Sequence, residues 1–534
     1  MRSSRTTAVF SILRVLWASL ALLLVVCVAT PLKGALDAPL WAALGQSLKQ
    51  QVKVHRLANG MTFILLERHD APIFGGVIRF RVGGVDEDPG KSGLAHLFEH
   101  LAFKGTRHIG TREPDREATA LKQLEEAVDQ VLAGESREPV DEQKLEKARQ
   151  RVTERQEAHR KLLVPEEFSQ LYTANGAKGL NATTNKDLTS YFVSLPANRL
   201  EFWCLMESER LRDGVLREFY SERDVVIEER LRGVETRPFG KLYEEFLIGA
   251  YGEAPYGIPT VGWLGDLEGL RTADAEAFRA RHYRPENAVA ALVGDFKIPE
   301  AIRLIERYFG SWRVLGPVPG KKTVIDADGD PPERPVRLEV PFNSQPYLLV
   351  GFDKPAAPHP DAAAFDVLHE LLEGGRSSRL YRSLVLERQV ALNVFTFEGP
   401  GQRFANLFIV GAVSQGPHSA ADVEEAILEE FAQLAKEPVG KQELTKALNA
   451  LRASFVNDLD SLLGLALQLS YHQSLYGDWR QMLRSLEAAL AVTPADIQKL
   501  AARYLLASRR VSAEIVPLSP APEVEKEVAP GETL

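Results

Sequence analysis

The sequence predicts an α+β protein with two related domains. From about residue 50, short β-prone segments alternate with longer segments of helical periodicity. Residues 316–335 interrupt this alternation with glycine, proline and charge, which is typical of a linker. The segments that end the two blocks, 272–293 and 493–516, each place a tyrosine 11 residues after a helix-capping threonine and then continue into an apolar strand. This shared order indicates a duplicated domain, although two unrelated helix–strand units would also give it.

Composition excludes several classes of protein. The chain has 534 residues, 45% of them apolar and 26% charged, which is typical of a globular chain and not of a disordered, collagenous or polytopic membrane protein. Its 64 basic and 73 acidic side chains leave a net charge of −9, so nucleic acid is not expected as a partner. The two cysteines cannot form a disulfide framework, and the apolar surroundings of Cys204 predict a buried thiol.

The N-terminus has the layout of a secretory signal peptide. Three arginines precede an uncharged run, residues 15–29, and no acidic residue occurs before Asp37. We expect residues 1–35 to be a signal peptide, cleaved after Ala29 or nearer Ala35, or else an uncleaved anchor that is the chain's sole membrane contact. A lipoprotein modified at Cys27 fits less well, because Val26 is not small. The expected location is therefore exported, in the periplasm or cell envelope of a bacterium.

The remaining chain divides into predicted segments. We expect a first domain at 48–315, a linker at 316–335, a second domain at 336–517 and a disordered tail at 518–534. Predicted strands open the first domain at 52–58, 62–67 and 75–84. Within it, residues 113–168 predict a helical hairpin with a break at 133–140, because its apolar residues recur at helical spacing among many charges. The apolar stripes should face each other and leave the charges in solvent.

The segment GLAHLFEHLAFKGT, residues 93–106, contains a candidate metal site. His96 and His100 stand four residues apart, so both imidazoles leave the same face of a helix and can share one ion. Glu99 lies between them and could take a proton from an attacking water. His-x-x-Glu-His is the inverse of the more common zinc-peptidase pattern. Because solvated helix charges can give the same five residues, a third ligand is needed to support the prediction.

A second helix supplies candidates for that ligand. In the predicted helix 218–235, Glu222 and Glu229 are seven residues apart and share one face. Glu228 points about 100 degrees away from Glu229.

Several ordered motifs resemble the pitrilysin and insulinase family of zinc metallopeptidases, in the short-subunit branch that includes mitochondrial processing peptidase. They are HLFEH with LAFKGT, then NATTNKDLTSYFVSLP from 181, ERDVVIEER from 222, PYGIPTVG from 255 and YRPENAVAALVGD from 283. The resemblance implies two domains, each a mainly antiparallel β-sheet packed with helices, and one Zn²⁺ per chain. It makes His96, His100 and Glu229 the zinc ligands, Glu99 the general base, and Glu222 a carboxylate that orients a ligand histidine.

The resemblance also implies that a peptide substrate adds as a strand to a sheet edge beside the metal. Asn181 and Ala182 match the segment that meets the substrate backbone, although a turn entering a strand would explain them equally well. The predicted hairpin is a departure, because it separates His100 from Asn181 by 181 − 100 = 81 residues where the short-subunit relatives have a tighter connection. It could act as a lid, a partner contact or an inert arm.

A second departure concerns the C-terminal block. Active members of the family bring an arginine and a tyrosine, seven residues apart, to the substrate carbonyl, and the matching positions here hold Val385 and Leu392. Neither side chain can donate a hydrogen bond to a developing oxyanion. The resemblance therefore implies a split enzyme, a dimer in which a related subunit supplies the missing pair. The alternative is that a neighbour substitutes from a shifted position, the candidates being Tyr381, Arg382 and Arg388.

Taken together, these observations predict a zinc endopeptidase that hydrolyses peptides or unfolded segments. A non-catalytic scaffold or peptide-binding subunit on the same fold is the main alternative. A third interpretation is an envelope-anchored scaffold that works through the hairpin.

Overall fold

The computed structural model describes residues 38–136, 140–314 and 336–518. The predicted signal peptide, the predicted linker and nearly all of the predicted tail lie outside the described residues. The chain divides into two compact units at residues 53 and 54, and the described helix of the first unit is α2 (Ala38–Gln51). In the described part of the chain, no helix combines the length and apolar character needed to cross a bilayer.

The first sheet contains six strands in the order β1-β2-β6-β3-β5-β4. Strand β2 pairs parallel with β6, whereas β6 with β3, β3 with β5, and β5 with β4 are antiparallel. The strands are β1 (Lys53–Arg56), β2 (Thr62–Glu67), β3 (Ile73–Phe80), β4 (Lys178–Thr184), β5 (Thr189–Pro196) and β6 (Ala288–Gly294).

The second sheet repeats this topology. Its five strands follow the order β7-β11-β8-β10-β9, with one parallel pair, β7 and β11, and antiparallel pairs elsewhere. The strands are β7 (Val336–Pro341), β8 (Tyr347–Lys354), β9 (Ala391–Gly399), β10 (Asn406–Ser414) and β11 (Arg510–Val516). The common order of strands agrees with the predicted duplication, and the two antiparallel-rich sheets confirm the predicted α+β class.

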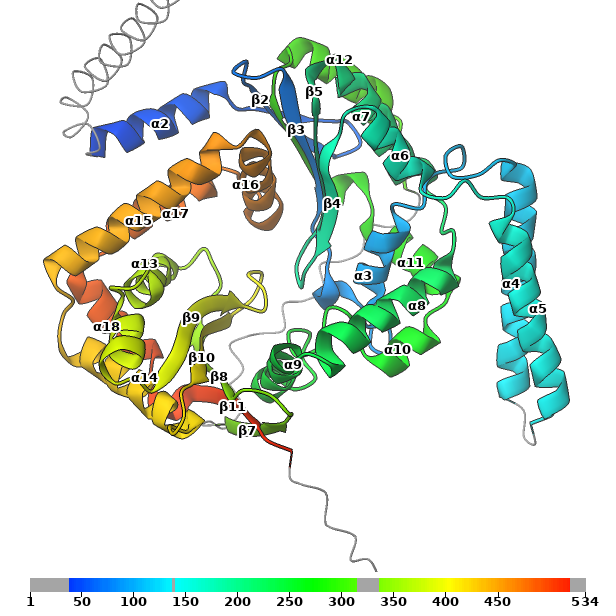
Figure 1. Cartoon of the computed structure of the whole chain (residues 1–534). Helices are drawn as coiled ribbons and strands as arrows, with labels where there is room; N and C mark the ends of the chain where they lie inside the picture. Colours follow the sequence, from blue (N-terminus) through cyan, green and yellow to red (C-terminus); the bar gives the residue numbers. More distant parts are fainter. Residues whose placement is uncertain (1–37, 137–139, 315–335, 519–534) are drawn as a thin grey trace, which may run out of the picture. The chain divides into compact units, whose positions relative to one another are not determined.

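Helices cover both sheets (Figure 1). Those of the first half are α3 (Leu94–Leu101), α4 (Pro114–Glu135), α5 (Glu142–Arg160), α6 (Glu167–Ala174), α7 (Leu200–Asp213), α8 (Phe219–Arg230), α9 (Pro238–Tyr251), α10 (Leu264–Gly269), α11 (Thr272–His282) and α12 (Ile298–Phe309). Those of the second half are α13 (Ala362–Glu373), α14 (Ala420–Lys436), α15 (Lys441–Asp460), α16 (Leu462–Tyr476), α17 (Gln481–Leu490) and α18 (Pro494–Tyr504). Cys204 on α7 is free and fully buried, as predicted.

Each half contributes one helix that packs on the sheet of the other half. Helix α16 packs on β3 and β6 of the first sheet, whereas α9 packs on β7, β8 and β11 of the second. Contact with α16 is close at Gly75, where an added Cβ would lie 2.7 Å from the Cα of Leu463. The side chain of Arg79 on the same strand donates from Nε to the hydroxyl of Ser470 at 3.3 Å.

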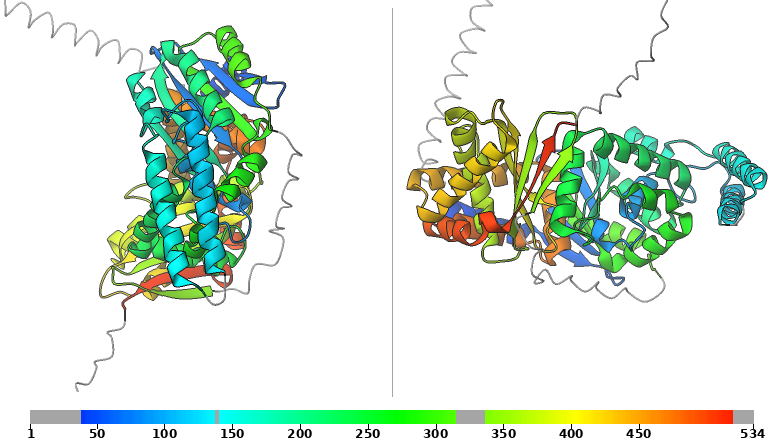
Figure 2. Two further views of the ribbon diagram at one scale, coloured as in Figure 1. Left: turned by 90° about the vertical axis from the view of Figure 1, so that its right-hand side faces the viewer. Right: turned by 90° about the horizontal axis from the view of Figure 1, so that it is seen from below.

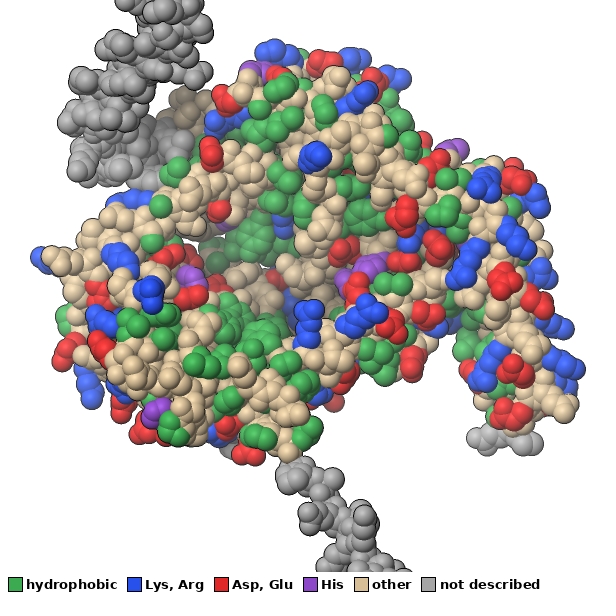
Figure 3. Space-filling model, viewed as in Figure 1, with side chains coloured by type: hydrophobic (Ala, Val, Ile, Leu, Met, Phe, Trp, Pro, Cys, Tyr) green, Lys and Arg blue, Asp and Glu red, His purple; other side chains and the backbone are tan. Residues whose placement is uncertain are grey.

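The predicted hairpin consists of α4 and α5, which run side by side in both views of Figure 2. The buried apolar side chains of the two helices are Leu124, Ala127, Leu145 and Ala148. Charged side chains of both signs cover its outer surface (Figure 3). The hairpin is therefore packed along an apolar seam and solvated elsewhere, as its sequence predicts.

Two predicted elements end earlier than expected. Strand β3 stops at Phe80, and a 3₁₀ turn follows at Gly84–Asp86. Just before this turn the backbone closely approaches another loop, since an added Cβ at Gly83 would lie 2.2 Å from the carbonyl oxygen of Asn185. The predicted helix 218–235 is α-helical only to Arg230, and a π-helical turn (Leu231–Glu235) follows. The backbone of α9 comes so close to this turn that Gly240 has no room for a Cβ beside Gly233.

The close contact at Gly75 makes a testable prediction. Gly75→Ala should lower the free energy of unfolding by about 1–3 kcal/mol, because the new methyl group meets helix backbone that cannot rotate away. The measurement is the apparent Tm by circular dichroism. Gly265→Ala, on α10 with open space around it, is the matched control and should leave Tm unchanged or slightly higher. Equal melting of Gly75→Ala and wild type would contradict the packing of α16 on β3.

Candidate metal centre

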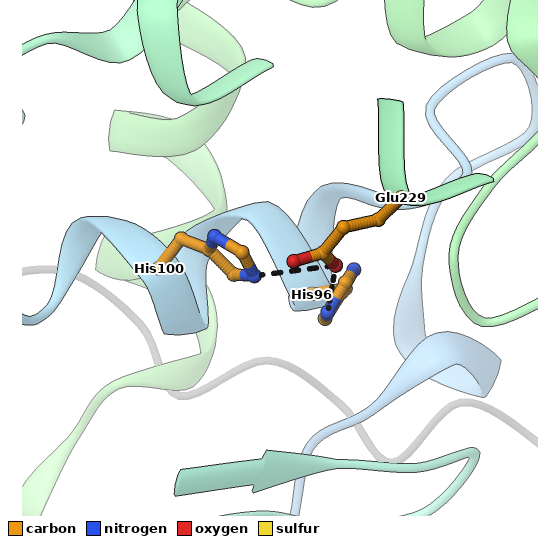
Figure 4. Close-up of side chains that lie close together, drawn as sticks. All are labelled: His96, His100 and Glu229. Atoms are coloured by element: carbon orange, nitrogen blue, oxygen red, sulfur yellow. Dashed lines mark ion pairs between the residues drawn. The ribbon is translucent and has the colours of Figure 1, made fainter. Parts of the chain in front are cut away.

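Two histidines and one glutamate converge between α3 and α8. Nε2 of His96 lies 3.6 Å from Oε2 of Glu229, and Nε2 of His100 lies 3.7 Å from the same oxygen. One ligand atom from each of the three residues lies within 4.8 Å of the others. Figure 4 shows both imidazoles, which leave α3 one turn apart, directed at the carboxylate from α8. The structure thus brings together the three residues that the sequence predicts as ligands.

The arrangement fits Zn²⁺ in both donor type and spacing. Zinc binds imidazole nitrogen and carboxylate oxygen at about 2.0–2.1 Å, so tetrahedral ligands stand about 3.4 Å apart. The two separations from Glu229 to the imidazoles, 3.6 and 3.7 Å, are close to that value, and all three donor atoms lie within 4.8 Å of one another. Three protein donors also leave a fourth position for water or substrate, and the Glu229 side chain is 48% exposed, so the site is open on that side.

Helix α3 is held at its N-terminus by a buried carboxylate. Glu87 accepts hydrogen bonds from the backbone N–H groups of Gly93, at 3.1 Å, and Ala95, at 2.7 Å. These are donors that the first turn of a helix leaves unpaired. Gly93 has φ of 86°, a left-handed conformation that glycine adopts without strain. Burial raises the pKa of Glu87 to about 8, although both backbone hydrogen bonds act against this.

The two histidines differ in their electrostatic surroundings. Burial, followed by the neighbouring His100, lowers the pKa of His96 to about 4, so its imidazole is neutral at pH 7 with a lone pair to offer a metal. Burial also acts to lower the pKa of His100, but the hydrogen bond to Glu222 and the charges of nearby carboxylates outweigh it and raise that pKa.

Glu222 lies on the side of the His100 ring that faces away from Glu229. Its Oε2 lies 3.5 Å from Nδ1 of His100, on the ring atom opposite the one that faces Glu229. A carboxylate at Nδ1 keeps the proton on that nitrogen and leaves Nε2 free for a metal. The other oxygen of Glu222 pairs with Nζ of Lys104 at 2.7 Å. Glu222 thus occupies the position that the family resemblance implies.

Glu99 is on the same helix as the two histidines, near β4. Burial raises its pKa, whereas a hydrogen bond with Thr184 of β4 and the charge of His100 act to lower it. A raised pKa makes the carboxylate a better proton acceptor, which is the property that a general base needs.

Asn181 and Ala182 lie within β4, not in a turn. They pair with Phe192 and Tyr191 of β5. Strand β4 ends the first sheet, and no described strand pairs with its outer edge, so its backbone can accept an added strand there. Helix α3 packs against β4, which places this edge beside the metal donors.

Val385 and Leu392 stand at the positions where the resemblance implies an arginine and a tyrosine. Val385 lies in a π-helical turn (Tyr381–Glu387) and packs on the second core, whereas Leu392 on β9 is 53% exposed. Two of the alternative hydrogen-bond donors already pair with carboxylates. Arg388 bonds to Glu429, and Arg382 pairs with Glu387 at 3.4 Å.

Sequence reasoning missed the supports of the centre. Lys104 could have been found, because it stands four residues after His100 in the same motif. Thr184 belongs to the NATT segment but carries no signal of its own. Glu87 gives no local signal either, since its role depends on a helix start six residues away that only the fold brings to it.

Comparisons with known proteins agree with this picture. Residues 270–451 match the family model described as the peptidase M16 inactive domain. The chain is 27% identical over 401 residues to a protein named zinc protease PqqE from Helicobacter pylori, covering 72% of this chain and 74% of that one. It is 26% identical over 439 residues to an uncharacterized zinc protease of Mycobacterium leprae, covering 82% and 84% respectively.

Solved structures share the fold. A protease from Helicobacter pylori superposes with a TM-score of 0.71 at 22% identity, covering 87% of this chain and 99% of that chain. A peptidase M16 inactive domain from Pseudomonas fluorescens gives a TM-score of 0.68 at 17% identity, covering 88% and 98%. Residues 270–451 are thus similar to the M16 inactive domain, and most of the chain is similar to proteins named zinc proteases and shares the fold of solved M16-type structures.

Proposed function

We propose that the chain is a zinc-dependent endopeptidase that hydrolyses peptides or unfolded segments. The observation that carries the proposal is the convergence of His96, His100 and Glu229, with donor separations suited to Zn²⁺. Glu99 on the same helix adds a carboxylate with a raised pKa beside these donors. The names of the relatives support zinc and proteolysis as the chemistry.

Each residue of the centre has a role in this proposal. His96, His100 and Glu229 would hold one Zn²⁺ per chain, which when bound supplies Lewis-acid activation of water and of the scissile carbonyl. Glu99 takes the proton from the attacking water and passes it to the leaving amine. Glu222 keeps the Nδ1 proton on His100. The outer edge of β4, at Asn181 and Ala182, orients the peptide backbone by strand addition.

We further propose that this chain is the zinc-bearing subunit of a split, dimeric enzyme. Val385 and Leu392 offer no hydrogen bond to a developing oxyanion, so a related subunit would supply the arginine and the tyrosine. Export to the periplasm or cell envelope remains part of the proposal, on the evidence of the N-terminal sequence.

The main competing function is a non-catalytic scaffold or peptide-binding subunit on the same fold. The match of residues 270–451 to an inactive-type domain is compatible with it. The intact set of metal donors favours an enzyme, because a scaffold has no need of them. Protein purified without chelator and found to contain no zinc would reverse this preference.

The role of Glu99 is tested by Glu99→Gln. The variant should keep one Zn²⁺ per chain by metal analysis, because the ligands are untouched, and lose about 10²–10⁴-fold in kcat on an unfolded peptide substrate. Glu228→Gln is the matched control, since Glu228 lies beside Glu229 in sequence but pairs outward with Arg232. Undiminished hydrolysis by Glu99→Gln would refute the assignment of the base.

The split-enzyme proposal predicts little turnover by the purified chain, measured on a sample whose oligomeric state has been established.

The double variant Val385→Arg with Leu392→Tyr should raise kcat at least 10-fold, because it restores groups able to stabilise an oxyanion, each typically contributing about 10²–10³. Full turnover by a verified monomer or homodimer of the wild-type chain would rule out the need for a partner.

A further inference from the structure

We propose that the buried ion pair between Glu117 and Arg217, at the base of the helical hairpin, positions the two helices that bear the metal donors. The inserted hairpin would then be part of the framework of the centre, not only a lid or an arm. This inference rests on the proposed function in one respect, namely that the ion bound by His96, His100 and Glu229 is Zn²⁺.

Arg217 is enclosed by the loop that follows α3. Its Nη1 donates to the carbonyl oxygens of Lys104, at 3.0 Å, and Ile109, at 2.8 Å, and its Nη2 donates to that of Thr106 at 2.6 Å. Gly105 and Gly110 have φ of 97° and 95°, and an added Cβ on either would come within 3.0 Å of Nη1. The loop therefore closes around the guanidinium and has no room for larger residues at the two glycines.

The hairpin provides the counter-charge for this cation. Glu117 of α4 accepts from Arg217 through both oxygens, including Nη2 to Oε2 at 2.8 Å, and His159 of α5 lies 3.1 Å from Oε1. The side chains of Arg217 and Glu117 are 1% and 3% exposed. Burial alone would raise the pKa of Glu117, but the hydrogen bonds with His159 and Arg217 outweigh it and lower that pKa to about 2. The pair is therefore charged at neutral pH, and loss of either member leaves a buried charge without its partner.

Arg217 lies close to both of the helices that carry the metal donors. Arg217 stands two residues before α8, which carries Glu222 and Glu229, and the loop that it binds begins at Lys104, three residues after the end of α3. The ion pair thus joins the end of one metal-bearing helix to the start of the other. Donor atoms on separate helices have to keep their spacing within a few tenths of an ångström to bind zinc tightly.

Lys104 extends this connection to a ligand. Its carbonyl oxygen accepts from Arg217, while its Nζ pairs with Glu222 at 2.7 Å. Glu222 in turn faces Nδ1 of His100 at 3.5 Å. Nζ also has Glu166 and Glu218 near it, each at 3.7 Å, so the cation stands among three carboxylates and is held in place.

The outer part of the hairpin makes no comparable contact. The lower part packs on the body through Glu125, which accepts from Tyr220 at 2.9 Å and Thr272 at 2.7 Å. Toward the tip, from Gln130 to Arg151, the hydrogen bonds and ion pairs of the described residues stay within the hairpin itself, such as Arg149 with Glu135 at 3.0 Å. Positioning should therefore depend on the base and not on the tip.

The test measures metal binding by the full chain in competition with a chelator. Glu117→Gln should weaken Zn²⁺ binding about 10–100-fold, the range expected for loss of a group that supports a ligand, and should alter the visible absorption bands of the Co²⁺-substituted protein. Glu117→Asp, which keeps the charge, should recover part of the affinity. Two controls should bind as wild type: Glu113→Gln, in an exposed pair with Arg116 at the same end of α4, and replacement of residues 132–148 by a four-residue Gly-Ser link.

The outcomes separate the two proposals. A folded Glu117→Gln variant with wild-type affinity and Co²⁺ spectrum would overturn the positioning role. If that variant does not fold, Glu117→Asp decides, because it keeps the charge but shortens the reach to Arg217: binding weaker than wild type supports the inference and unchanged binding overturns it. Weakened metal binding in these variants would uphold the positioning role even if the peptidase is refuted, that is, if neither the double variant Val385→Arg with Leu392→Tyr nor wild type mixed with a related subunit that carries the arginine and the tyrosine hydrolyses peptide. Wild-type protein that binds no Zn²⁺ would overturn both.

Discussion

A buried cation organises the first half of this molecule. Arg217 is almost fully shielded from water, and an unpaired charge in such a place costs several kcal/mol. A carboxylate from the inserted hairpin balances the charge of Arg217, and three carbonyl oxygens of one short loop accept hydrogen bonds from its guanidinium. Because the loop follows α3 and the arginine precedes α8, satisfying the charge also brings together two helices that are more than a hundred residues apart in sequence.

The charged groups around the metal donors are also paired with one another. His100 presents one ring nitrogen to Glu229 and the other to Glu222, and Glu222 shares its second oxygen with Lys104. His96 differs from His100, because its Nδ1 is buried and has no hydrogen-bond partner among the described residues. A chain of paired charges keeps donors in place more firmly than isolated contacts do.

The sequence predicts the centre better than it predicts what surrounds it. Periodicity alone puts His96 and His100 on one face, and a seven-residue interval does the same for Glu222 and Glu229, so both local halves of the site are predictable. Their meeting depends on packing between α3 and α8, which the family resemblance implied and local pattern could not. Arg217, Glu87 and Thr184 act through partners far away in sequence or on another element, and no spacing rule identifies them. The early end of β3 and the π-helical turn after Arg230 each lie beside a close backbone approach from another segment, at Gly83 and at Gly240, which local pattern does not indicate.

The packing of α9 and α16 on the sheet of the opposite half bears on whether either half can fold alone. Residues of α9 form one apolar cluster with strands of the second sheet, and α16 covers β3 and β6 of the first, so each sheet is completed by a helix encoded in the other half. A protein with only one copy of this unit would expose the face that the borrowed helix covers. Neither half is therefore a self-contained folding unit, and the two halves have to fold together to bury both sheets.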